Sequence, residues 1–146
     1  MIKTMCAAAM VLTIFGASAI AGRPEQNDSV PRLNSRIGAT DPQRYKTVRD
    51  PKNWENPCLV IRRDGIEVIA KGLPSGRQIV ATAELRRTLI ELPVAAWPYG
   101  RVVAVQKFNA RALDGSDEKP IDDNLIIMVA FLKGLEVTIE KWPGGQ

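Results

Sequence analysis

Residues 57–72 constrain the fold more than any other part of this chain. Two aliphatic runs, residues 59–61 and 66–69, flank the dipeptide Asp64-Gly65. Asp-Gly is a strong signal for a two-residue hairpin loop, because both central residues of that loop take positive φ. The sequence therefore predicts a β-hairpin. Its expected cross-strand pairs are Ile61 with Val68, Val60 with Ile69, and the oppositely charged Arg62 with Glu67.

A helix and a strand are predicted next. Leu85, Leu89 and Leu92 recur at i, i+4 and i+7, so they share one face of a helix. We expect this helix over residues 82–92, with the threonine at its start as N-cap and a proline directly after it. The β-branched run at residues 101–106 is typical of a central strand.

The last part of the chain predicts a second helix and a final strand. Apolar residues from Ile121 to Leu132 follow one helical face, and Gly134 is the expected C′ residue. Residues 135–142 alternate between apolar and polar, as a strand with one wet face does. A short third strand also fits residues 78–80. The order β-β-α-β-α-β predicts an α+β two-layer sandwich, with a mixed sheet of about four strands and two helices on one face.

The chain ahead of the hairpin predicts two segments of different character. Residues 1–21 carry a positive charge at Lys3, an apolar core, and a small-x-small pattern ending at Ala19 or Ala21, as cleaved export signals do. The alternative is an uncleaved anchor, although the apolar run is shorter than the about 20 residues that span a bilayer. The next segment contains prolines and arginines without apolar periodicity. The predicted division is a signal peptide (1–21), a flexible tether (22–56), the α+β domain (57–142) and a tail (143–146), in a secreted or periplasmic protein.

Composition excludes several chemistries. The chain contains no histidine, which removes the usual general base and zinc ligand. The net charge is +4, but the basic residues are scattered among acidic ones, so nucleic acid is not an expected partner. No cofactor is predicted. Cys58 is the one cysteine beyond residue 21, and its place at the start of an apolar strand favours a buried, inert thiol. The acidic stretch 114–123 lacks the spacing of a recognised calcium loop, and cation binding there stays open.

Three tryptophans are the candidate binding residues: Trp54, Trp97 and Trp142. Each lies close to a proline, and an aromatic side chain held by a rigid turn loses little entropy on binding. The alternative is that these side chains simply cover the two ends of the core. Trp142 is the expected main contact, since strand alternation places it on the side of the last strand that faces away from the helices.

The element order resembles a known family. An N-terminal apolar segment, a proline-containing tether and a β-β-α-β-α-β domain opened by strand–Asp64-Gly65–strand resemble the periplasmic part of ExbD/TolR-type biopolymer-transport proteins. The similarity covers about residues 59–139. It implies the architecture and no functional residues, because residues 5–21 lack the acidic residue that the family's retained membrane segment uses for proton coupling. Residues 98–103 also resemble a family stretch, but one that opens a helix where this sequence predicts a strand.

Two classes of function remain open from the sequence. The favoured one is an exported, non-enzymatic module that binds a protein or another envelope component through a free sheet edge, the wet sheet face or the tryptophan-bearing turns. The alternative is a small carboxylate-dependent hydrolase. Neither a nucleophile motif nor a glycine-rich phosphate loop occurs in the sequence, which favours the binding module.

Overall fold

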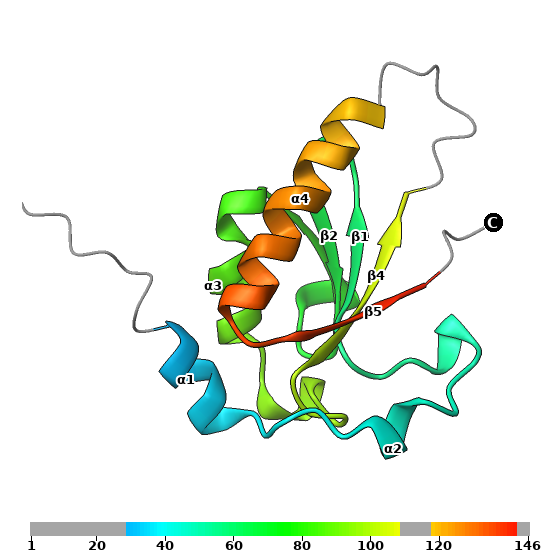
Figure 1. Ribbon diagram of the computed structural model, residues 1–146, viewed down its shortest axis with the longest axis vertical. Coiled ribbons are helices and arrows are strands. Elements are labelled where there is room, and N and C mark those ends of the chain that lie inside the picture. Colours follow the sequence, from blue (N-terminus) through cyan, green and yellow to red (C-terminus); the bar gives the residue numbers. More distant parts are fainter. Residues whose placement is uncertain (1–28, 109–117, 143–146) are drawn as a thin grey trace, which may run out of the picture.

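The computed structural model describes residues 29–108 and 118–142, which form a sheet with helices packed on one side (Figure 1). The strands within these ranges are β1 (Cys58–Ile61), β2 (Ile66–Ile69), β3 (Arg77–Val80), β4 (Val102–Lys107) and β5 (Thr138–Lys141). They form one sheet in the order β3-β2-β1-β4-β5. The pairs β1–β2 and β2–β3 are antiparallel, whereas β1–β4 and β4–β5 are parallel. The α+β class with a mixed sheet is confirmed, and β3 makes five strands where about four were expected.

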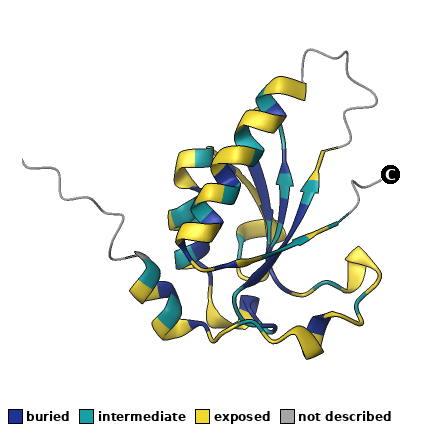
Figure 2. Ribbon diagram, viewed as in Figure 1, coloured by how far each residue is buried: buried dark blue, intermediate teal, exposed yellow. Residues whose placement is uncertain are grey.

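The two predicted helices lie over the same face of the sheet. The α-helices of the described ranges are α1 (Ser29–Arg36), α2 (Pro42–Tyr45), α3 (Leu85–Glu91) and α4 (Glu118–Gly134). Leu89 of α3 and Met128 of α4 are fully buried in one core with Leu59 of β1. Figure 2 shows this burial concentrated in the strands and along the inward sides of the helices. No helix in these ranges is both long and apolar enough to cross a membrane.

The start of α3 differs from the prediction. Thr82 lies in a short 3-10 turn ahead of the helix and makes no capping bond. Its hydroxyl instead donates to Oδ1 of Asn124 on α4, at 2.9 Å. Asn124 in turn donates from Nδ2 to the carbonyl of Arg62, at 2.9 Å. These two bonds connect α4 to the element before α3 and to the end of β1.

The hairpin register also differs from the prediction. Val60 lies opposite Glu67 instead of Ile69, so the expected pairing is wrong by two residues. The amide of Arg62 donates to the carbonyl oxygen of Gly65, so the loop between the strands ends before Gly65 instead of containing it. Gly65 takes φ +150°. A Cβ on this glycine would lie 2.3 Å from the carbonyl oxygen of Val80. The glycine is therefore required because β3 passes close to it.

Residues 29–56 are folded onto the domain, which corrects the prediction of a flexible tether; residues 22–28 lie outside the described residues. Val30, Leu33 and Ile37 recur at i, i+3 and i+7, a helical stripe that the nearby prolines obscured. Leu33 and Ile37 are only 1% and 2% exposed and belong to the core beneath the helices. Arg36 of α1 also donates to the carbonyl oxygens of Ile90 and Leu92 at the end of α3.

Residues 38–56, which we call the strap, continue from α1 to the opposite face of the sheet (Figure 1). A second, smaller core forms there around Tyr45, Tyr99 and Val102, with Trp54 packed against it. The strap therefore closes part of the sheet face that the helices leave open.

The final strand begins later than predicted. Glu136 takes φ +55°, so the extended strand does not begin at residue 135, and β5 starts at Thr138. The expected alternation of burial is nevertheless present, since Leu135 and Val137 are buried. The helix α4 includes Gly134, so Glu136 instead of this glycine adopts the left-handed conformation after the helix. The side chain of Glu136 is held by Asn34 of α1, whose Nδ2 donates to it at 2.7 Å. The predicted signal peptide and the tail lie outside the described residues.

Candidate binding site

Four aromatic side chains meet on the strap side of the sheet, at the β4–β5 edge. Tyr45 and Trp54 come from the strap, Tyr99 precedes β4, and Trp142 directly follows β5. The ring centroid of Trp54 lies 5.6 Å from that of Tyr45, 5.3 Å from that of Tyr99 and 5.7 Å from that of Trp142. All three contacts are edge-on, an arrangement that aromatic quadrupoles favour. Trp54 is thus the centre of the cluster.

The buried Asn56 anchors the strap beside this cluster. Its Nδ2 donates to the carbonyl oxygens of Gly100 and Val102, at 2.8 and 2.7 Å. Its Oδ1 accepts from the backbone amide of Tyr99, at 2.8 Å. A side chain that is 2% exposed has its hydrogen-bonding groups satisfied in this way. The strap is therefore fixed to the segment that carries Tyr99.

Gly100 permits the close approach on which this arrangement depends. It takes φ +77°, and a Cβ there would lie 2.2 Å from the carbonyl oxygen of Ala39. Two backbone hydrogen bonds flank the contact: the amide of Arg101 donates to Gly38 at 3.1 Å, and the amide of Asp41 donates to Tyr99 at 3.0 Å. The strap thus lies directly on the backbone at residues 99–101.

Two Asp-Pro dipeptides shape the strap itself. Asp41 accepts a capping bond from the amide of Gln43, and Asp50 accepts one from the amide of Lys52. In both cases the following proline occupies the first turn, where its missing N–H costs nothing. The short helices α2 and η1 (Pro51–Asn53) present Tyr45 and Trp54 to the sheet. Pro42 and Pro51, two of the prolines that suggested a tether, therefore lie at the starts of helices.

A pocket of about 340 Å³ opens beside the aromatic cluster, and we call it the aromatic pocket. Its lining residues are Tyr45, Lys46, Val48, Arg49, Trp54, Glu140, Lys141 and Trp142. Three side chains in this set are cationic and one is a carboxylate. Burial, followed by the charge of Glu140 and a hydrogen bond to it, raises the pKa of the Tyr45 hydroxyl above its usual 10.0. The hydroxyl therefore stays protonated near neutral pH.

This lining suits a ligand that combines a flat or apolar group with a negative charge. Aromatic walls stack on rings and cover apolar groups, and exposed cations attract anions to the rim. The volume lies at the lower end of the about 300–1,000 Å³ typical of ligand pockets. The single carboxylate of the lining, Glu140, lies near the Tyr45 hydroxyl and contributes to the rise in its pKa. The geometry is therefore that of a binding surface.

The structure brings two of the three candidate tryptophans together and separates the third. Trp54 and Trp142 are half-buried walls of the aromatic pocket. Trp97 is 4% exposed and belongs to the core beneath the helices. Sequence reasoning missed Tyr45 and Tyr99, the other two members of the cluster. The Asp-Pro caps around the strap were the available signal that this segment is ordered.

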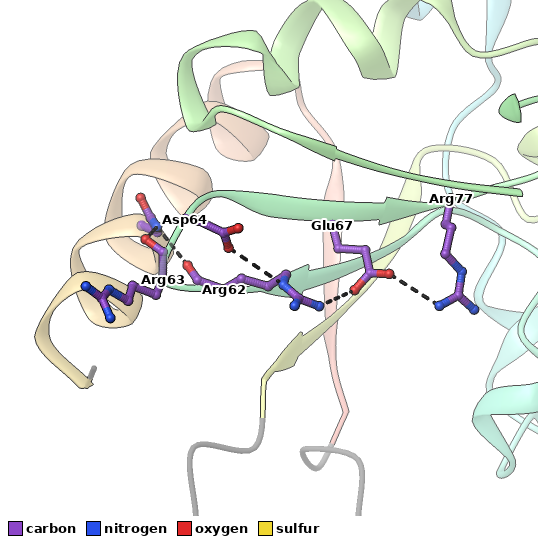
Figure 3. Close-up of polar contacts among 6 residues, drawn as sticks. Arg62, Arg63, Asp64, Glu67 and Arg77 are labelled. Carbon is purple, nitrogen blue, oxygen red and sulfur yellow. Dashed lines mark hydrogen bonds and ion pairs between the residues drawn. The ribbon is translucent and has the colours of Figure 1, made fainter. Parts of the chain in front are cut away.

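The acidic residues of the hairpin are held in ion pairs (Figure 3). The carboxylate of Glu67 is 11% exposed and lies between Arg62 Nη1, at 2.9 Å, and Arg77 Nη1, at 3.5 Å. Asp64 lies 3.7 Å from Nε of Arg62. The guanidinium of Arg62 also stacks over the ring of Phe108, 4.7 Å from its centroid. The opposite-charge pair of Arg62 and Glu67 is therefore present, although the two residues are not directly opposite each other.

Cys58 is half-buried, where the sequence predicted a buried thiol. Burial, followed by the negative charge of Glu67, raises the pKa of the Cys58 thiol to about 11. The thiol is therefore protonated and weakly nucleophilic at neutral pH. No group of three acidic or cysteine side chains that could hold a metal ion occurs in the described ranges. Residues 114–117 of the acidic stretch lie outside those ranges, whereas Asp122 and Asp123 pair with Lys107 and Lys119.

Comparison of the chain with protein-family models, with curated proteins and with solved structures found no match. The resemblance to ExbD/TolR-type periplasmic domains therefore stays a prediction.

Proposed function

We propose that this chain is an exported, non-enzymatic binding module of the cell envelope, which holds a protein or another envelope component at the aromatic pocket. The observation that carries this proposal is that Trp54 and Trp142, which are far apart in the sequence, contact each other and form part of the wall of one open pocket. The same pocket is lined by cationic side chains. Large aromatic side chains at the centre of a contact are the usual source of binding energy. The export part of the proposal rests on residues 1–21.

The charges around the pocket support binding rather than hydrolysis. Carboxylate-dependent hydrolysis of a glycosidic bond, for example, uses a pair of carboxyl groups that flank the bond. The aromatic pocket contains one carboxylate, Glu140, and Glu67 is engaged by two arginines elsewhere on the same sheet face. The cations Lys46 and Arg49 instead provide an attractive rim for an anionic partner.

The test compares retention of envelope components by wild-type protein and by a Trp142→Ala variant. The cleaved chain is immobilised, and retained components are quantified by mass spectrometry. We expect the free energy of unfolding of the variant to lie within about 1 kcal/mol of the wild-type value, because Trp142 is only half-buried at the end of β5. We also expect the variant to lose the retained component. Ile79→Ala is the matched control, since Ile79 is 49% exposed on β3, at the far edge of the sheet.

Two results would contradict the proposal. A stability loss of several kcal/mol for Trp142→Ala would make this side chain part of the core. Equal retention by wild type, Trp142→Ala and an Arg49→Glu variant would show that the aromatic pocket is not the contact surface.

A further inference from the structure

A second pocket lies on the other face of β5, between this strand and α4. We call it the apolar cleft; its volume is about 400 Å³. It is lined by Ile61, Val105, Lys107, Leu125, Val129, Ile139, Lys141 and Trp142. Five of these side chains are aliphatic. The cleft is separate from the aromatic pocket, although Lys141 and Trp142 border both.

The cleft exists because α4 covers the sheet incompletely at this edge. Leu125 and Val129 of α4 and Ile139 of β5 are only partly buried, whereas Met128 and Leu132 on the same helix are fully buried. β5 is the edge strand of the sheet that residues 29–108 and 118–142 form, so within these ranges no strand beyond it adds side chains to close the gap. Apolar surface is thus left exposed inside a concave site.

Positive charge lies at one end of the cleft. Lys107 follows Val105 by two residues and Lys141 follows Ile139 by two, so strand alternation places both lysines on the helix side of the sheet. Because β4 and β5 are parallel, both lysines lie toward the C-terminal ends of these strands, where Lys141 is level with Val105 and Lys107 is level with Ile61 of β1. Lys107 Nζ pairs with Asp122 at 2.6 Å. Lys141 has no ion-pair partner among the residues that the structure describes, so its ammonium group is available to a ligand in the cleft.

We propose that the apolar cleft binds a single acyl chain that ends in a carboxylate, with the chain between α4 and β5 and the carboxylate at Lys141. The aliphatic walls exclude a polar ligand, because polar groups placed there would lose their bonds to water without replacement. The ammonium of Lys141, which has no ion-pair partner among the described residues, favours a ligand with a negative head over one with a neutral or positive head. A fatty-acid anion has this combination of an apolar chain and one terminal negative charge. This proposal goes beyond the proposed function, because it concerns the other face of the sheet and a small ligand.

The experiment is isothermal titration calorimetry of the cleaved chain with sodium decanoate, below its micellar concentration. Decyltrimethylammonium, which has a chain of the same length and a positive head, is the matched probe. We expect saturable one-to-one binding of decanoate and binding of decyltrimethylammonium that is at least about tenfold weaker. In Lys141→Glu this preference should invert, since the variant reverses the charge at the mouth and leaves the aliphatic walls unchanged.

A second variant tests the chain-binding part. Val129→Phe adds a ring to the wall of the cleft and should abolish decanoate binding, whereas Ile79→Phe, on the far edge of the sheet, should not change it. Circular dichroism shows whether Val129→Phe folds, and Lys141→Glu, at an exposed position, keeps the proposal testable if it does not.

Several outcomes overturn the proposal. They are no saturable heat with decanoate, equal binding of the two probes, or unchanged preference in Lys141→Glu. If Val129→Phe loses the envelope component retained by wild type but still binds decanoate, the cleft is a protein contact and not an acyl site. Arg49 lines only the aromatic pocket and Val129 lines only the apolar cleft, so retention by Arg49→Glu and decanoate binding by Val129→Phe allow the two proposals to fail separately.

Discussion

Replacing Gly100 by alanine should detach the strap from the sheet. An alanine at φ +77° costs about 1–2 kcal/mol in backbone strain. Its Cβ would also lie 2.2 Å from the carbonyl oxygen of Ala39, so the backbone must separate there. Separation weakens the two flanking hydrogen bonds, Arg101 to Gly38 and Asp41 to Tyr99, each contributing about 0.5–1.5 kcal/mol. We therefore expect Gly100→Ala to lose about 2–5 kcal/mol of unfolding free energy.

The assay is urea unfolding followed in parallel by circular dichroism and tryptophan fluorescence. Circular dichroism reports the helices and the sheet, whereas fluorescence includes Trp54, which the strap holds against Trp142. A loss of about 2–5 kcal/mol lowers the melting temperature of a domain this size by about 10 °C or more. If the strap detaches first, the fluorescence transition precedes the loss of circular dichroism.

Gly38→Ala is the matched control, one residue from the contact. A Cβ on Gly38 meets no atom within 4 Å, and this glycine is not among those with positive φ. The substitution should leave stability unchanged or raise it by up to about 1 kcal/mol, because alanine restricts the unfolded chain. The reasoning is refuted if Gly100→Ala unfolds within about 0.5 kcal/mol of Gly38→Ala with the fluorescence spectrum of wild type.

Four further predictions follow from single residues. Asn56→Asp places a carboxylate against two carbonyl oxygens and should cost about 2–4 kcal/mol in a denaturant melt, whereas the exposed Asn53→Asp should be near neutral. The Cys58 thiol has a pKa of about 11 in the folded protein against 9.0 when unfolded, so the unfolded chain loses this proton first as the pH rises. The free energy of unfolding should therefore fall from pH 9 to 11, and it should fall less steeply in Cys58→Ala. A maleimide should label the thiol slowly in the native protein at pH 8 and quickly in denaturant. Gly65→Val puts a side chain against the carbonyl of Val80 and should cost about 1–3 kcal/mol or more, so an unchanged melt would contradict the close approach of β3. Intact-mass measurement of the exported protein should show cleavage after residue 19 or 21, and a retained segment 1–21 would indicate an anchor.

Local periodicity was sufficient to predict α3, α4 and the central strands. The leucine spacing before Pro93 and the β-branched run of β4 depend on nearest neighbours along one element, and both predictions are confirmed. The hairpin register was not predictable in this way. Gly65 looks like a turn residue in the sequence, but the structure uses it to admit Val80 of β3, a contact that no local pattern encodes.

The candidate site shows the same limit. Trp97 and Trp142 both precede a proline, yet one is buried beneath the helices and the other borders the aromatic pocket. Their difference depends on which face of the sheet each segment reaches, and this is a property of the whole fold. In residues 29–56 the prolines suggest breaks, whereas the structure is ordered there. In Asp41-Pro42 and Asp50-Pro51 the aspartate caps the helix that the proline begins, a signal that was present in the sequence.

The strap has a consequence for the order in which the chain folds. Thr40 contacts Thr138 through their hydroxyls at 2.9 Å, and Asn34 bonds to Glu136, across 98 and 102 residues. A ribosome releases residues 29–56 first, but the backbone and side chains that hold them belong to β4, β5 and the turn after α4. Closing loops of this length is slow and entropically costly, so these contacts form only after the strands have paired. Until then the aromatic rings of the strap are exposed to solvent, and the nascent domain has only one of its two sheet faces covered.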